Sequence, residues 1–298
     1  MFTKKNIAFA AIMLGLLGMA EQASATEGGG GIYPNGNENF MVGALPPPGF
    51  YALVYAGNYN ASSLRDNSGN QVPFNFNLRV TSLVPRAILV TEQTLLGGQL
   101  AFHAIAPILN MSVAAGPASQ AKTGLGDISI GAGLGYHASD KFHYTFGLDV
   151  NAPTGSYDKN NLANLGRNYW NMEPVVALTY VQAEGINADL KVMYDFNKRN
   201  SATNYKSGQE LHADYAIGWG FGNGFTAGAG GYFYEQTTDD DIGGATVANN
   251  RGKAFAIGPS IKFDNGKGWF ITAKYQRESS VRNRPQGDEF KLKMTIPF

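Results

Sequence analysis

Apolar and polar residues alternate with a period of two in short segments along most of this chain. The last ten residues, EFKLKMTIPF, alternate without a break and end on Phe298. Strict alternation of this kind predicts a β-strand with one apolar and one polar face. The predicted strands lie near residues 50–60, 74–91, 98–113, 125–137, 141–152, 168–182, 187–196, 209–221, 225–236, 252–263, 269–278 and 289–298. The chain is therefore predicted to be all-β, with about twelve strands of about 10 residues each.

The apolar faces of these strands favour contact with lipid over burial in a protein core. The faces end repeatedly in Tyr, Trp or Phe, as the aromatic girdles of outer-membrane barrels do, whereas the inner faces of a soluble sandwich interdigitate in a packed core. The apolar side of the first strand is predicted to carry Tyr51, Leu53, Tyr55 and Tyr59, that of the second Phe74, Phe76, Leu78 and Val80, and that of the last Phe290, Leu292, Met294, Ile296 and Phe298. We expect a transmembrane antiparallel up-and-down β-barrel over residues 49–298.

The connections between the predicted strands alternate in length. Long segments such as TGSYDKNNLANLGRN and TTDDDIGGATVANN follow the odd-numbered strands, and tight turns such as ASDK, AEGI, GNG and DNGKG follow the even-numbered ones. Gly and Asn in the tight turns supply the positive φ that short hairpins need. Outer-membrane barrels have short periplasmic turns and long outer loops, and an even number of strands leaves both ends of the wall in the periplasm. A soluble sandwich has no reason for such an alternation.

The N-terminal region predicts export. Lys4 and Lys5 precede an apolar stretch over residues 7–19, and Ala23-Ser24-Ala25 offers a cleavage site, so residues 1–25 are predicted to be a cleaved signal peptide. A membrane anchor is the alternative, but the stretch is shorter than the ~20 residues of a span and contains glycine. Residues 26–48 are rich in Gly and Pro and form either a flexible periplasmic leader or a plug inside the barrel.

The composition excludes several classes of protein. Charged residues make up only 15% of the chain, glycine is abundant with 38 residues, and the formal net charge is zero, which argues for many turns and strands and against nucleic acid as a partner. The chain has no cysteine, which excludes disulfides, thiolate metal sites and a cysteine nucleophile. After residue 25 no apolar run approaches the ~18 residues of a transmembrane helix.

The polar faces of the strands predict a charged lumen. Twelve strands about 4.8 Å apart and tilted by about 40° give a backbone diameter of about 24 Å, and inward side chains leave at most about 12 Å of open width. One small molecule can pass such a lumen. The predicted lumen-lining residues are Arg79, Asp127, His143, Asp149, Glu173, Asp189, Glu210, His212, Asp214, Lys274, Lys291 and Lys293.

Four prolines fall inside predicted strands, at Pro85, Pro107, Pro174 and Pro259. Proline removes a hydrogen bond from the ladder, so each should mark a bulge, a kink or a strand end. The alternative is a local opening in the barrel wall, through which a solute could leave sideways.

Motifs for catalysis or metal binding are weak. The histidines His103, His137, His143 and His212 stand in no metal-ligand spacing, although a Ser-His-Asp set cannot be tested by spacing alone. The glycines of GLGDISIGAGLGY alternate within a strand, which favours room in the lumen over a dinucleotide loop. The acidic turn TTDDDIGG lacks the spacing of a calcium loop. We expect no catalytic residue, no metal site and no cofactor.

Several stretches in consistent order resemble the outer-membrane proteins grouped as transporters of the meta-pathway of phenol degradation. The matching stretches are PPPGFY, GLGD, PTGSYD, NLGRNYW, EPVVALTY, YKSGQELHADYA, GYFYEQTTDD, AIGPSI and RNRPQGD. The resemblance implies an outer-membrane barrel that admits hydrophobic or aromatic compounds for catabolism. It carries no residue-level binding site with it.

The working hypothesis is a monomeric channel in a Gram-negative outer membrane for passive uptake of small hydrophobic or aromatic compounds. Expected partners are outer-membrane lipid and lipopolysaccharide, the solute, and the barrel-assembly machinery, which would bind the C-terminal strand ending at Phe298. Three alternatives remain: a general porin for polar nutrients, a hydrolase in the barrel wall, and a largely structural barrel. The charged polar faces fit apolar cargo poorly, because no apolar patch in the lumen is evident from the sequence.

Overall fold

The structure, a computed structural model, describes residues 26–298. The predicted signal peptide, residues 1–25, lies outside the described residues. Within residues 26–298, no helix has the length and hydropathy to cross a membrane.

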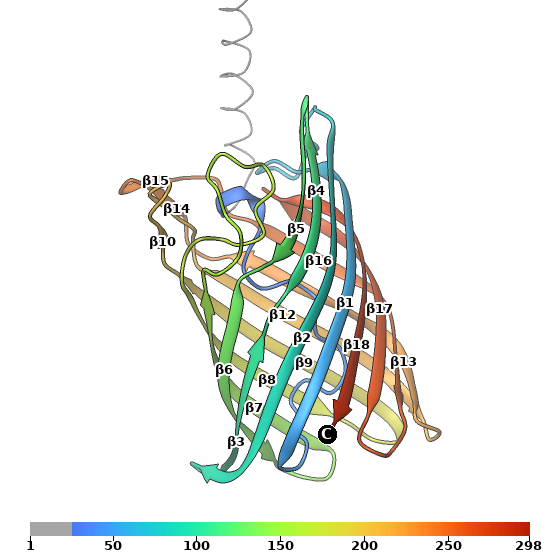
Figure 1. Cartoon of the computed structure of the whole chain (residues 1–298). Helices are drawn as coiled ribbons and strands as arrows, with labels where there is room; N and C mark the ends of the chain where they lie inside the picture. Colours follow the sequence, from blue (N-terminus) through green and yellow to red (C-terminus); the bar gives the residue numbers. More distant parts are fainter. Residues whose placement is uncertain (1–25) are drawn as a thin grey trace, which may run out of the picture.

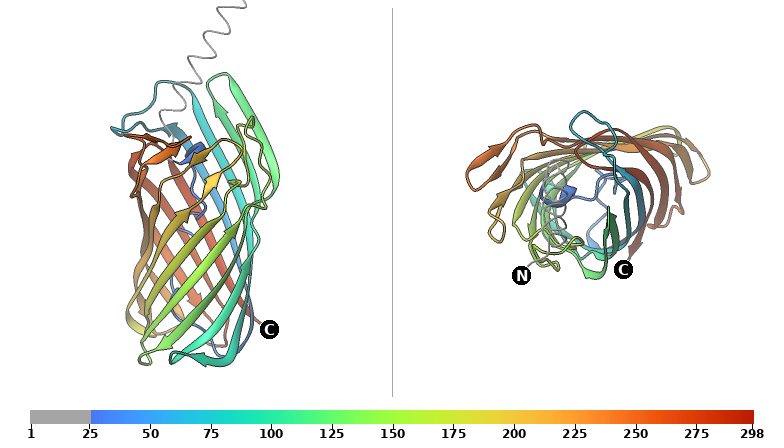
Figure 2. Two further views of the ribbon diagram at one scale, coloured as in Figure 1. Left: turned by 90° about the vertical axis from the view of Figure 1, so that its left-hand side faces the viewer. Right: turned by 90° about the horizontal axis from the view of Figure 1, so that it is seen from above.

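Twelve antiparallel strands close into a barrel, which confirms the predicted fold (Figures 1 and 2). The wall consists of β1 (Gly49–Leu64), β2 (Phe76–Leu95), β3 (Gly98–Ile105) with β4 (Ile108–Ala115), β5 (Ala118–Leu125) with β6 (Ile128–His137), β7 (Phe142–Ala152), β8 (Asn171–Tyr180), β9 (Glu184–Asn197), β12 (Glu210–Phe221), β13 (Phe225–Gln236), β16 (Lys253–Asp264), β17 (Phe270–Arg282) and β18 (Pro285–Pro297). The barrel closes because β1 pairs with both β2 and β18.

A few short elements lie at the rim of the barrel that carries the long loops, which we call the loop end. They are the 3-10 turn η2 (Glu27–Gly29) and a small sheet of β10 (Arg199–Asn200), β11 (Tyr205–Lys206), β14 (Asp240–Ile242) and β15 (Ala245–Val247). The opposite rim carries the tight turns, the start of β1 and the C-terminus, where Phe298 N donates to Phe50 O. Two expected long loops are instead strand: β4 and β5 meet at a tight turn around Gly116, and β17 and β18 meet at Asn283 and Arg284. In both hairpins the polar residues that were expected to form a loop extend the two strands instead.

The outer face of most strands is apolar, as the alternation predicts. On β18, Phe290 and Met294 are 44% and 36% exposed, whereas Lys291 and Lys293 between them are buried inside the barrel. The same orientation holds on β12, where Ile217 and Trp219 are exposed and Asp214 is buried.

The first two strands face the opposite way from the prediction. Tyr55 is only 2% exposed and its hydroxyl lies inside the barrel, while Leu78 and Val80 line an internal cavity. Arg79 and Thr81, expected inside, therefore lie on the outer face of β2. Both faces of these strands carry apolar residues, so a period of two does not by itself reveal which face meets lipid.

Backbone hydrogen bonds join neighbouring segments of the wall at Pro85 and Pro107. Ala106 N donates to Pro85 O at 3.2 Å, and Gly126 N donates to Pro107 O at 2.9 Å. Pro107 stands at the kink between β3 and β4, as expected for a strand end. In this structure the wall is therefore closed beside Pro85 and Pro107.

Pro174 and Pro259 each interrupt one ladder and leave the other intact. The β8–β9 and β16–β17 ladders skip the two residues around each proline, but Pro174 still pairs with Leu148 and Pro259 with Ala229. Both proline rings are exposed on the outer face. They mark local irregularities of the kind that proline requires.

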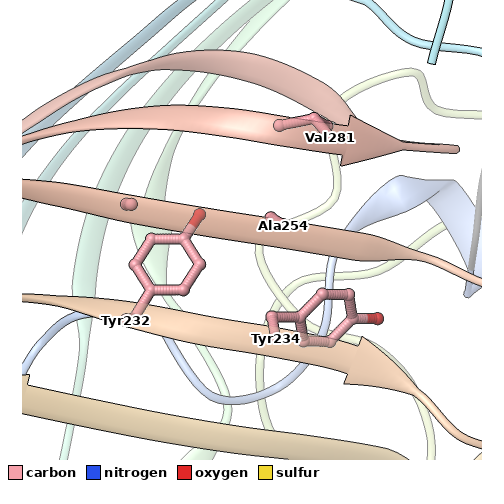
Figure 3. Packing of buried hydrophobic residues seen from close by; sticks show 5 residues of the cluster. Tyr232, Tyr234, Ala254 and Val281 are labelled. Carbon is pink, nitrogen blue, oxygen red and sulfur yellow. The ribbon is translucent and has the colours of Figure 1, made fainter.

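Aromatic and small residues pack on the inner side of β13, β16 and β17 (Figure 3). Tyr232, Tyr234, Ala254 and Val281 belong to this buried cluster. The Tyr232 hydroxyl donates to the Glu278 carboxylate, which satisfies a buried polar group. These side chains form the inner surface of the wall on this side of the lumen.

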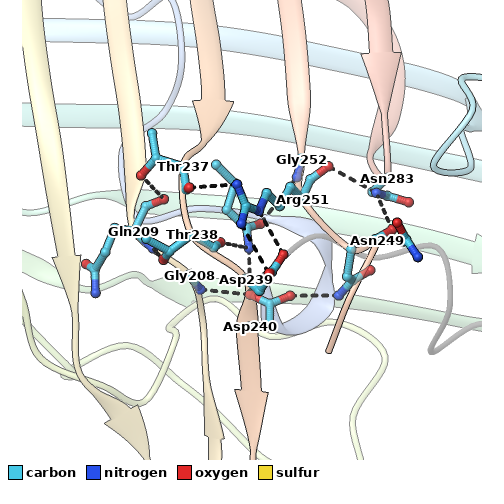
Figure 4. A network of polar contacts seen from close by, with 12 residues as sticks. Gly208, Gln209, Thr237, Thr238, Asp239, Asp240, Asn249, Arg251, Gly252 and Asn283 are labelled. Carbon is cyan, nitrogen blue, oxygen red and sulfur yellow. Dashed lines mark hydrogen bonds and ion pairs between the residues drawn. The ribbon is translucent and has the colours of Figure 1, made fainter. Parts of the chain in front are cut away.

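The acidic turn of residues 239–241 is held by protein groups (Figure 4). Asp240 accepts bonds from Gly208 N at 2.7 Å and Tyr205 Oη at 2.6 Å. Asp239 pairs with Arg251 at 2.7 Å, and this hydrogen bond holds the pKa of the Asp239 carboxyl below its usual value. These carboxylates tie the loops together, and Asp240 is buried by protein groups where a solvated acidic turn was expected.

Candidate functional site

Residues 26–48 run through the inside of the barrel from the loop end to the start of β1 (Figures 1 and 2). At the loop end, Glu27 N donates to Ser207 Oγ at 3.2 Å, and the Glu27 carboxylate accepts bonds from Tyr157 and Asn200. At the other end, Tyr51 Oη donates to Pro47 O at 2.8 Å. The segment therefore occupies the lumen along the length of the barrel.

Asp214 is the main anchor of this segment. Its carboxylate, 1% exposed on β12, accepts bonds from Tyr33 Oη at 2.6 Å, Gly36 N at 2.8 Å and Glu38 N at 2.8 Å. Bonds to an ionised acceptor are stronger than neutral ones. Three such bonds to one carboxylate fix the segment against β12.

Glu38 of the segment reaches the opposite side of the barrel. Its carboxylate pairs with Lys293 at 3.0 Å and accepts a bond from Tyr55 Oη at 2.9 Å. Lys274 Nζ donates to the Glu38 backbone oxygen at 2.7 Å. The segment therefore crosses the lumen between β12 on one side and β1, β17 and β18 on the other.

Below Glu38 the segment fills the lumen. Val42 N donates to Asp189 at 3.0 Å, and Gly43 N donates to Thr179 Oγ1 at 2.8 Å. Leu45 packs against Gly135. A Cβ added at Gly135 would lie 3.0 Å from Leu45 Cβ and still closer to a methyl group of Leu45, so a larger residue at position 135 would collide with Leu45. Gly135 thus leaves the room in the lumen that the glycine alternation predicted.

A cavity of about 280 Å³ lies in the loop-end half of the lumen, between the segment and the wall. One of its sides is apolar and is formed by β1, β2 and the wall strand made of β3 and β4. The apolar residues on this side are Tyr55, Tyr59, Leu78, Val80, Val84, Ile105, Pro107, Leu109 and Met111, with Leu165 from a loop. This is the apolar lumen patch that the sequence did not reveal.

Charged residues line the rest of the cavity. They are Asp149 on β7, Glu173 on β8, Lys191 on β9 and Arg167 from the loop after β7, and Arg86 lies on β2 beside the apolar residues. Asp149 bonds to His103 at 2.8 Å, and Arg86 lies 3.4 Å from Glu38. A solute in this cavity would meet an apolar surface and a charged surface at once.

Most of the predicted lumen residues point inward from the strands. The buried ones are Asp149, Glu173, Asp189, Glu210, His212, Asp214, Lys274, Lys291 and Lys293. Asp127 sits at the kink between β5 and β6, where its carboxylate accepts bonds from Gly155 N and Arg167 N. His143 lies beside His137 at the tight-turn rim, 2.8 Å between their Nδ1 atoms, away from the cavity. Arg79 is outside the barrel, because the second strand faces the other way.

Sequence reasoning missed Arg86 as a lumen residue and left Lys191 out of the named lumen set. Lys191 was available from its alternation with Asp189, but Arg86 lies on the β2 face that was assigned to lipid. The apolar side of the cavity was missed for the same reason.

Solved structures with a similar fold are outer-membrane barrels. The COG4313 outer membrane channel from Pseudomonas putida F1 superposes with a TM-score of 0.76 at 20% identity, covering 90% of this chain and 100% of that one. The translocator domain of the autotransporter NalP from Neisseria meningitidis gives a TM-score of 0.50 at 12% identity, covering 85% of this chain and 90% of that one. No curated protein matches the sequence. At these identities the likeness concerns the fold.

The sequence itself matches one family model, described as "Putative MetA-pathway of phenol degradation", over residues 61–294. This range covers most of the barrel wall, from the end of β1 to β18. It includes the stretches from GLGD to RNRPQGD on which the resemblance was based. The chain therefore belongs to this family, and its fold is that of an outer-membrane channel.

Proposed function

We propose that this chain is an outer-membrane channel for the passive uptake of small amphipathic aromatic compounds, with residues 26–48 acting as its gate. The observation that carries the proposal is the divided cavity, which sets an apolar side formed by β1, β2 and β4 against a charged side. An aromatic ring with one polar group matches both sides.

The size of the cavity supports a solute of one ring. An apolar cavity of about 150 Å³ holds a benzene molecule. The 280 Å³ here leaves room for a ring with a hydroxyl or carboxylate group and some water. Below the cavity the segment fills the lumen, so passage requires the segment to move.

The proposed route runs along the barrel axis. The backbone bonds at Pro85 and Pro107 close the wall beside the cavity. The bonds that hold the segment are made with side chains of the wall and loops, among them Asp214, Lys293 and Asp189, and they can break without unfolding the wall. Displacement of the segment thus costs less than opening the barrel.

The location and assembly of the protein follow from the same proposal. The apolar outer face would contact lipid and lipopolysaccharide in the outer membrane of a Gram-negative cell. The signal peptide would direct export, and β18, which ends at Phe298, would be bound by the barrel-assembly machinery. The barrel would act as a monomer and would catalyse no reaction.

Liposome swelling tests the proposal against the porin alternative. Neutral phenols cross lipid unaided, so the probe is an aromatic carboxylate, compared with a sugar of similar mass in liposomes containing the purified barrel. Faster entry of the aromatic compound, reduced selectively by Leu109→Asn on the apolar side, is the expected result. Equal or faster entry of the sugar would favour the general porin. Lipid hydrolysis that disappears in His103→Gln would favour the hydrolase.

A further inference from the structure

Three buried side chains on two neighbouring strands place one imidazole nitrogen and two carboxylates close together on the inner wall. Asp195 lies on β9, and Glu210 and His212 lie on β12. All three side chains are completely buried, and one ligand atom from each lies within 4.8 Å of the others. His212 Nε2 is 2.9 Å from Asp195 Oδ2 and 3.8 Å from Glu210 Oε2.

The hydrogen bond between Nδ1 of His212 and Asn35 shows which ring nitrogen carries a proton. Nδ1 lies 2.6 Å from the amide oxygen of Asn35, which can only accept, so Nδ1 carries the proton and donates it. In the neutral imidazole the lone pair of Nε2 then points toward the Asp195 carboxylate. Nε2 of His212 and Oδ2 of Asp195, 2.9 Å apart, therefore share either a proton or a metal ion.

The two carboxylates are close to each other, and the cations that act on them, Arg284 on Glu210 and Lys191 on Asp195, make no ion pair with them. Glu210 and Asp195 stand directly opposite each other in the β9–β12 ladder, which places like charges side by side. Asn197 Nδ2 donates to Glu210 Oε1 at 2.7 Å, whereas Glu210 Oε2 and Asp195 Oδ1 accept no hydrogen bond of good geometry within residues 26–298. Tyr234 lies beside Glu210, and Asn171 and Glu173 lie beside Asp195. Among the described residues no Lys or Arg forms an ion pair with either carboxylate; Arg284 lies instead over the Tyr234 ring.

We propose that Asp195, Glu210 and His212 form a binding site for a divalent first-row metal ion such as Zn²⁺. Ligands about 2.1 Å from a tetrahedral zinc ion lie about 3.4 Å apart. The two separations from Nε2, 2.9 and 3.8 Å, bracket this value. One imidazole and two carboxylates suit zinc or manganese better than calcium, which takes six to eight oxygens.

The surroundings match those of a metal site. A metal-binding histidine usually donates its second ring N–H to an oxygen, as His212 does to Asn35, and ligating carboxylates accept further bonds, as Glu210 does from Asn197. Asn35 and Glu173 line the cavity, which gives an ion a way in. The sequence predicted no metal site, because only the register of β9 against β12 brings these ligands together.

Zinc binding to the purified full-length barrel in detergent tests the proposal. We expect about one equivalent of Zn²⁺ by calorimetry and metal analysis, and Glu210→Gln to weaken it at least about 100-fold, since loss of a ligand should exceed the 10- to 100-fold cost of losing an outer partner. His103→Gln is the matched control, because His103 faces the single carboxylate of Asp149 and should leave zinc binding unchanged. Substoichiometric zinc, or equal affinity in Glu210→Gln, would overturn the site.

X-ray absorption on the zinc-loaded wild-type protein gives a second measurement that needs no variant. A shell of nitrogen and oxygen at about 2.0–2.1 Å with one imidazole is the expected result. A fully hydrated ion would contradict the proposal. In that case the Asp195–His212 pair would be assigned to a shared proton.

A functional arm of the test rests on the proposed gating. Asn35 belongs to the lumen segment, and a Cβ at Gly31 would lie 2.5 Å from Glu210 Oε2, so the segment packs over the site. Bound metal should hold the segment in place, and Zn²⁺ should lower conductance in the wild type but not in Glu210→Gln. Binding without an effect on conductance would count against the gate and leave the metal site standing.

Discussion

Removing the Asp214 carboxylate should release the segment that fills the lumen. Asp214→Ala removes three bonds to the segment, from Tyr33, Gly36 and Glu38. Hydrogen bonds to a charged group contribute about 1.5–3 kcal/mol each, and neighbouring bonds do not add fully, so the docked state should lose about 3 kcal/mol or more. At about 1.4 kcal/mol for each factor of ten, the displaced population should rise about 100-fold.

Planar-bilayer recordings measure this change directly. The wild-type channel should spend most of its time in a low-conductance state, and Asp214→Ala should open more often and for longer. Removal of residues 26–45 gives the upper limit of conductance with which the variant is compared. In liposomes, Asp214→Ala should also speed the entry of both aromatic carboxylates and sugars, because an open lumen loses its selectivity.

Asp240→Ala is the matched control for this experiment. Asp240 also accepts a tyrosine hydroxyl and a backbone N–H, from Tyr205 and Gly208, but it lies in the loop network and has no bond to the segment. It should leave conductance near the wild-type level. If Asp214→Ala conducts like the wild type while deletion of residues 26–45 opens the channel, Asp214 is not the anchor. If the deletion also has no effect, the gating proposal fails.

Three further predictions follow from the lumen and the outer face. Because the chain has no cysteine, Leu45→Cys with Gly135→Cys creates the only thiol pair; it should form a disulfide that lowers flux until a reductant is added, and unchanged flux in the oxidised protein would contradict a moving segment. On the apolar side of the cavity, Val84→Asn should slow aromatic carboxylates several-fold and leave sugar entry through liposomes unchanged; an equal loss for both solutes would point to simple obstruction. On the lipid face, Phe290→Arg should destabilise the barrel by about 2–4 kcal/mol if Phe290 lies at mid-membrane depth, measured by urea unfolding in lipid vesicles, and no loss of stability would place Phe290 outside the bilayer.

The architecture of the barrel was predictable because it depends on local patterns. The alternation in EFKLKMTIPF places Phe290 outside and Lys291 inside, and the structure shows both. Tight turns that contain Gly and Asn set the rim at which both ends of the wall lie. A strand that separates lipid from a polar lumen must alternate in this way, so the pattern and the structure agree wherever the lumen is polar.

The orientation of β1 and β2 was wrong because the lumen beside them is apolar. Tyr55 and Leu78 face the lumen segment and the cavity, and the outer faces of the same strands carry apolar residues such as Val54 and Leu83 together with polar Arg79. When both faces are apolar, a shift of one residue in the assignment reverses every side chain. For the same reason Arg79 was predicted to line the lumen, although it lies on the outer face of β2.

The candidate site could be predicted only in part. The inward carboxylates were found from the polar faces of β9 and β12, but their partners come from residues 26–48, more than a hundred positions away in the sequence. Nothing in the alternation reveals that Asp214 binds the segment, or that Asp195 stands opposite Glu210. Such contacts depend on strand register and on the path of the segment, which no local pattern encodes.

The charges of the lumen do not argue for polar cargo, because most of them are already engaged. Asp214, Asp189 and Lys293 bind the lumen segment, and Lys274 bonds to its backbone. A solute that enters from the loop end therefore meets few of these groups. It meets instead the apolar side chains of β1, β2 and β4, with charged groups around them. Because burying apolar surface is favourable at about 25 cal/mol per Å² and displacing a bonded charge is costly, this lumen favours a ring with a polar group over a sugar.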